Sequence, residues 1–178
     1  MPVEHQISLS RSTFPQKGFP VTTSTLHHAL AHSSAGDLER LARRYALNPN
    51  LGALLPDGGE RDWARLADHD GAEVWLISWP NGVETGWHDH DGSLGAFAVA
   101  SGAVVEQTWD GAHVVSRPLA AGESRAFGES HVHNVRGAGA GRSLTVHAYA
   151  PRLTTLTSYE LTAQGPRAVS VTREGADW

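Results

Sequence analysis

The chain has 178 residues and a formal net charge of −5, which gives no electrostatic footprint for binding nucleic acid or an anionic membrane surface. It contains no cysteine, so disulfides, thiolate nucleophiles and cysteine-bound metals are excluded, while its 11 histidines are a surplus suited to metal binding or proton transfer. Because no apolar run approaches the ~20 residues of a membrane span and no signal-peptide core precedes residue 12, we expect a soluble, cytoplasmic protein.

The first 60 residues are expected to form an arm and short helices that pack on the main fold. Residues 1–23 carry three prolines and little periodicity, which is typical of an irregular surface segment. From 25 to 45, apolar residues recur at helical spacing with an interruption at 33–36. This pattern predicts two short helices, with Asp37 as a candidate N-cap of the second. Residues 48–60 are rich in proline and glycine and are expected to be a loop.

Residues 61–178 are expected to form one mainly β domain, because short apolar runs alternate there with turn signals such as Asn81-Gly82 and Asp110-Gly111. Regular spacing of this kind favours a small antiparallel sandwich or barrel. The predicted strands are 73–79, 95–99, 104–109, 113–118, 124–127, 131–136, 143–149, 154–161 and 168–172.

Histidines pair at two places, at residues 88 and 90 and in the predicted strand 131–136. In a strand, residues i and i+2 face the same way, so His88 and His90 can offer two imidazoles to one metal, while Asp89 faces away. His131 and His133 share parity in a later strand-like run, and either could supply a third ligand. A lone His-x-His pair is more often incidental than a metal site, so the hypothesis depends on these segments meeting.

A third segment is expected to line the same site. Thr145, His147 and Tyr149 alternate with apolar residues and therefore share one face of a strand. An inward row of three polar groups is costly to bury unless the groups bind one another or a ligand.

The spacing from Gly82 through His88-x-His90 to Gly102 resembles the first motif of the cupin superfamily, whose double-stranded β-barrel binds metal in its interior. Most cupins place a glutamate ligand where this chain has Gly95, so the resemblance is to the branch with three histidine ligands, the thiol dioxygenases, and to the cysteine dioxygenase family in particular. Trp79, nine residues before His88, fits that family. The further segments that resemble it are Trp63-Ala64-Arg65, His133-Asn134-Val135 and Thr145-x-His147-x-Tyr149-x-Pro151.

The resemblance implies a specific site and reaction. The metal would be Fe(II) on His88, His90 and His133; Arg65 would bind the substrate carboxylate; Tyr149 would contact the substrate or oxygen, oriented by His147 and Thr145. The implied reaction oxidises L-cysteine with O2 to cysteine sulfinate. Mammalian members carry a cysteine at position 95 that crosslinks to the tyrosine, whereas Gly95 leaves Tyr149 unmodified, as in bacterial members.

Several alternatives stay open at this stage. His131 rivals His133 as third ligand, and Arg61 rivals Arg65 because Arg65 lies closer to the histidine pair than the mammalian spacing has it. The substrate could be another carboxylated thiol such as 3-mercaptopropionate. The chain could also be a non-oxidative metal-binding cupin. The sequence does not indicate the oligomeric state.

Overall fold

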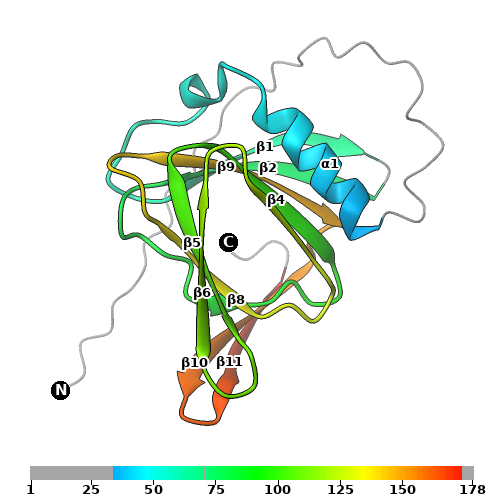
Figure 1. The fold of residues 1–178 in the computed structure, drawn as a ribbon. Coiled ribbons are helices and arrows are strands. Elements are labelled where there is room, and N and C mark those ends of the chain that lie inside the picture. The colour runs from blue at the N-terminus through cyan, green and yellow to red at the C-terminus, as the bar shows by residue number, and fades with distance from the viewer. Residues whose placement is uncertain (1–33, 70, 174–178) are drawn as a thin grey trace.

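The computed structural model describes residues 34–69 and 71–173, which form two antiparallel sheets (Figure 1). One sheet has the strand order β1-β2-β9-β4-β7 and the other has the order β11-β10-β3-β8-β5-β6. The mainly β fold predicted from the sequence is confirmed. The first predicted helix and the N-terminal arm fall outside the described residues. Within the described ranges, no helix has the length and apolar character needed to cross a bilayer.

The elements follow one another along the chain as one helix, one short 3₁₀ turn and a series of strands. The helical elements are α1 (Ala35–Ala46) and η2 (Leu51–Ala53). The strands of the first sheet are β1 (Asp62–His69), β2 (Ala72–Trp79), β4 (Leu94–Ser101), β7 (Ser124–Phe127) and β9 (Ser143–Ala150). The strands of the second are β3 (Trp87–His88), β5 (Ala103–Trp109), β6 (Val114–Ala120), β8 (His133–Gly137), β10 (Thr155–Thr162) and β11 (Gly165–Arg173).

The central strand β9 is buried on both faces, and this defines the layers of the molecule. Its outward residues Val146 and Ala148 pack with Leu38 of α1, which lies across β4 and β9 (Figure 1). Its inward residue Tyr149 belongs to a second apolar cluster that includes Val104 from the opposite sheet. A helix therefore covers one side of this sheet, and the other side faces the space between the two sheets.

The start of α1 corrects one prediction. Ser34, not Asp37, is the N-cap: its side chain accepts a hydrogen bond from the Asp37 backbone N–H, and the Asp37 carboxylate accepts one from the Ser34 backbone. Asp37 is thus the N3 partner of a capping box, a position that also favours an acidic residue.

Three strand assignments also differ from expectation. Strand β3 is not among the predicted strands, and it ends at His88, so His90 lies beyond the strand that was expected to carry both histidines. Strand β1 is not among the predicted strands, because a register shift between Arg65 and Ala67 disrupts the alternation by which a strand is recognised. The predicted strand 131–136 begins only at His133, since His131 belongs to a turn in which its N–H donates to Gly128 O. His131 and His133 therefore do not share a strand face.

Gly102, at the β4–β5 turn, shows why this motif position needs glycine. Its φ is +72°, in the left-handed region, and a Cβ atom there would lie 2.4 Å from Ser143 Oγ. Ser143 Oγ itself accepts a hydrogen bond from the Ala103 backbone N–H and donates one to the Ala103 carbonyl oxygen.

Candidate metal centre

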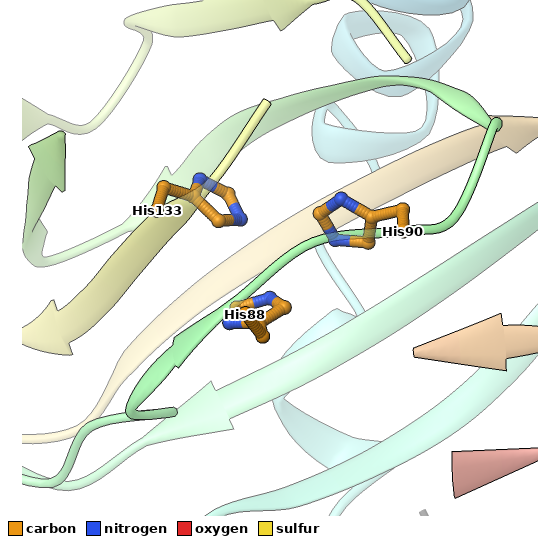
Figure 2. A group of neighbouring side chains, drawn as sticks. All are labelled: His88, His90 and His133. Atoms are coloured by element: carbon orange, nitrogen blue, oxygen red, sulfur yellow. The ribbon is translucent and has the colours of Figure 1, made fainter. Parts of the chain in front are cut away.

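Three buried histidines converge between the sheets (Figure 2). His88 lies in β3 and is paired directly with His133, the first residue of β8. His90 follows β3 in the turn closed by the Ser93 N–H bond to His90 O. One ring nitrogen from each histidine lies within 4.8 Å of those of the other two.

The outward hydrogen bonds of two rings decide which nitrogen faces the centre. His88 Nδ1 lies 3.0 Å from Gly86 O, and a carbonyl can only accept, so Nδ1 carries the proton. His133 Nδ1 lies 2.9 Å from Glu106 Oε1 and donates to that carboxylate. In both rings the Nε2 lone pair is left for a ligand in the shared space.

The electrostatics of the cluster keep the rings neutral, which is the form that binds metal. His88, His90 and His133 are 8%, 2% and 1% exposed. Burial lowers the pKa of all three rings, and the neighbouring histidines lower the pKa of His88 and His90 further. For His133, the hydrogen bond to Glu106 raises the pKa and offsets part of this effect.

A row of hydrogen bonds runs along the inner face of β9 beside the cluster. Trp79 Nε1 donates to Thr145 Oγ1 at 2.7 Å, Thr145 Oγ1 lies 2.8 Å from His147 Nε2, and His147 Nδ1 lies 3.0 Å from the Tyr149 hydroxyl. Thr145, His147 and Tyr149 therefore share the inner face of β9, as expected, and they form hydrogen bonds with one another. The Tyr149 ring reaches the cluster, with its centroid 4.8 Å from that of His90.

The titration of this row favours one set of protonation states. Burial lowers the pKa of His147 to about 3, with His133 and Arg61 adding to the effect, so this ring is neutral. Burial also raises the pKa of Tyr149 above its usual value, which keeps the phenol protonated. A neutral imidazole thus holds a protonated phenol beside the histidine cluster.

The two arginine candidates lie in different surroundings. Arg65 is paired with Asp68 at 2.8 Å and Glu73 at 3.3 Å, and its side chain is 38% exposed. The Arg61 guanidinium carbon lies 5.6 Å from the Trp79 ring centroid, beside the hydrogen-bonded row. Its positive charge lowers the pKa of Tyr149, His147 and His88.

Glu106 is a residue that sequence reasoning missed, because its segment shows only the pattern of a strand. It is 1% exposed and faces inward on β5 with Val104. His131 Nε2 donates to Glu106 Oε1 at 2.9 Å, so this histidine contacts the carboxylate and lies outside the group formed by His88, His90 and His133. Burial alone would raise the pKa of Glu106, but hydrogen bonds from His131 and His133 outweigh it and hold the pKa well below its usual range.

Phe127 occupies the space next to Gly95. A Cβ atom at Gly95 would lie 2.2 Å from the Phe127 ring, which is itself stacked between His90, at 5.3 Å, and His131, at 4.7 Å. Gly95 is the cross-strand partner of Tyr149 on β9. The absence of a side chain at 95 thus makes room for an aromatic ring against the histidine cluster.

The sequence model of the family described as cysteine dioxygenase type I matches residues 37–162, well over half of the chain. The chain belongs to the cysteine dioxygenase type I family. The matched range contains nearly all of α1 and all the cluster histidines. None of the curated proteins compared with the chain matches it.

The chain is also similar to solved structures at low sequence identity. A double-stranded β-helix protein from Klebsiella pneumoniae is 19% identical with a TM-score of 0.48, covering 65% of this chain and 90% of its own. A cupin superfamily protein from Desulfitobacterium hafniense is 16% identical with a TM-score of 0.49, covering 59% and 90%. A protein from Thermus thermophilus is 20% identical with a TM-score of 0.51, covering 60% and 98%. Only the last of these TM-scores exceeds 0.5, and at 20% identity that likeness concerns the fold alone.

The residues present fit a metal ion, as expected for this family. Three neutral imidazoles, each with a ring nitrogen close to those of the other two, are a donor set suited to Fe, Cu, Ni or Zn in the divalent state. Because none of the three carries charge, such a centre would keep its full positive charge and favour an anionic ligand from outside the protein.

Proposed function

We propose that this protein is an iron(II)-dependent thiol dioxygenase that oxidises L-cysteine with O2 to cysteine sulfinate. The observation that carries the proposal is the neutral three-histidine cluster beside a protonated tyrosine, with 4.8 Å between the ring centroids of His90 and Tyr149. In the overall reaction both oxygen atoms are added to sulfur. The thiol sulfur loses four electrons to O2, and its proton is released.

In this proposal the metal ligands are His88, His90 and His133. Bound Fe(II) would supply dioxygen activation and bind the substrate sulfur as a thiolate. Tyr149 would donate its hydroxyl proton to the substrate or to oxygen. His147 and Thr145 would orient that hydroxyl.

For the substrate carboxylate we propose Arg61 in place of Arg65. The Arg61 guanidinium lies over the aromatic rings of Trp63 and Trp79, and within residues 34–69 and 71–173 no carboxylate is paired with it, so its planar fork would suit a bidentate contact. The Arg65 guanidinium already binds two carboxylates of the protein, so a substrate would have to displace them.

Oxygen uptake by the iron-loaded protein tests the reaction. L-cysteine, 3-mercaptopropionate and cysteamine should be compared side by side, with the product identified by mass. We expect L-cysteine to be consumed fastest and to gain two oxygen atoms. Faster consumption of 3-mercaptopropionate would reassign the substrate. Stoichiometric iron without oxygen uptake would favour a non-oxidative cupin and overturn the proposal.

Matched substitutions of the two arginines test carboxylate binding. Loss of a charge-assisted hydrogen bond costs about 1.5–3 kcal/mol, so Arg61→Met should lower kcat/KM for carboxylated thiols roughly ten- to hundred-fold. Arg65→Met should change it little. Cysteamine, which lacks a carboxylate, should not distinguish the variants. A selective loss in Arg65→Met alone would restore the assignment made from the sequence.

A further inference from the structure

Glu106 is a buried carboxylate that accepts a hydrogen bond from His133, a proposed metal ligand, at the ring nitrogen that faces away from the cluster. It is 1% exposed, as is His133. Moving a carboxylate out of water costs several kcal/mol unless hydrogen bonds and opposite charge compensate it. The groups that contact Glu106 must therefore compensate the cost of burying its charge.

Three donors surround this carboxylate. His133 Nδ1 and His131 Nε2 both donate to Oε1 at 2.9 Å, and Arg125 Nε donates to Oε2 at 3.0 Å. Arg125 supplies the balancing positive charge from a side chain that is 34% exposed.

Two rings of the cluster differ in the acceptor that each one's Nδ1 contacts. His88 donates its Nδ1 proton to a neutral carbonyl, that of Gly86, whereas His133 donates to an anion. A charged acceptor makes a hydrogen bond roughly twice as strong as a neutral one and makes the ring a better donor through its other nitrogen. His133 is thus more strongly polarised than His88.

We propose that Glu106 is a positioning residue for the metal centre. It holds His133 with Nδ1 protonated and Nε2 aimed at the space shared with His88 and His90, and it places one negative charge behind an otherwise neutral set of ligands. This inference rests on the proposed function only in requiring that a metal occupies the three histidines.

The test measures the metal without substrate or oxygen. Glu106→Gln preserves shape and removes the charge. We expect it to weaken Fe(II) binding roughly 10–100-fold in anaerobic competition with a chelator, to alter the Co(II) absorption spectrum, and to raise the Fe(III)/Fe(II) potential. Glu106→Asp, which keeps the charge, should recover part of the affinity. Glu160→Gln, which breaks only the exposed ion pair with Arg167, is the control.

A second variant acts in the opposite direction and perturbs a more exposed side chain. Arg125→Met leaves Glu106 without its balancing charge, so the potential should fall. A folded Glu106→Gln protein with native metal affinity and spectrum would overturn the inference. If that variant does not fold, an unchanged potential in Arg125→Met would do so. Wild-type protein that binds metal but consumes no oxygen with thiols would instead overturn only the proposed function.

Discussion

At the scale of single residues, one indole fixes the direction of the hydrogen bonds along β9. Trp79 Nε1–H can only donate, so Thr145 Oγ1 accepts from it, and of the two partners of this hydroxyl only His147 can receive its proton. His147 therefore carries its proton on Nδ1 and donates to the Tyr149 oxygen. The Tyr149 proton is left to point toward an acceptor in the site.

Thr145→Val tests this direction because it keeps the side-chain shape and removes the hydroxyl. If Thr145 acts only through Tyr149, we expect thiol oxidation to lose roughly 10–100-fold in kcat/KM, with Fe(II) affinity unchanged. Adding Thr145→Val to Tyr149→Phe should then cause no further loss. Additive losses in the double variant would mean that Thr145 contributes independently of Tyr149.

At the scale of elements, the pattern of the sequence predicted most strands because each has a turn signal at its ends and a run of β-formers between. It could not reveal β1, whose bulge after Arg65 shifts the alternation, or the turn that separates His131 from β8. The Thr145 row was recognisable because strand parity is local, and the His88 and His90 pair was recognisable from its short spacing, although His90 lies in the turn after β3. Glu106 was not, because its partners come from segments 19 to 27 residues away.

The capping box of α1 gives a prediction at this scale. Ser34→Ala removes the side chain that accepts from the Asp37 backbone N–H, which typically costs about 1 kcal/mol. We expect a lower free energy of unfolding in urea and unchanged metal affinity, since α1 packs on the sheet face opposite the site. Ser170→Ala, at an exposed position of β11, is a control expected to stay within about 0.5 kcal/mol. Equal effects of the two substitutions would contradict the role of the cap.

At the scale of the whole molecule, the buried histidines link stability to pH. Folding lowers the pKa values of His88, His90, His133 and His147, so the metal-free native state stays neutral while the unfolded chain takes up protons below about pH 6.5. Their contribution is fully present above that pH and is lost as the pH falls. For His147 the loss extends toward about pH 3.

Urea unfolding of metal-free protein in the presence of a chelator should show this loss between about pH 7.5 and 5.5. The slope is at most about 1.4 kcal/mol per pH unit for each histidine, and His147→Gln should reduce it. His113→Gln, at an exposed position, should leave it unchanged. A free energy of unfolding that stays constant over this range would show that the buried rings are not held neutral.

The contact between Gly95 and the Phe127 ring constrains how this chain could diverge. A cysteine at 95 of the kind that mammalian relatives use for a thioether has no room while the phenyl ring stays stacked between His90 and His131. Replacing the phenylalanine first would leave a cavity against two imidazoles. Either single step therefore passes through a destabilised protein, so the two positions are expected to change together within the family or not at all.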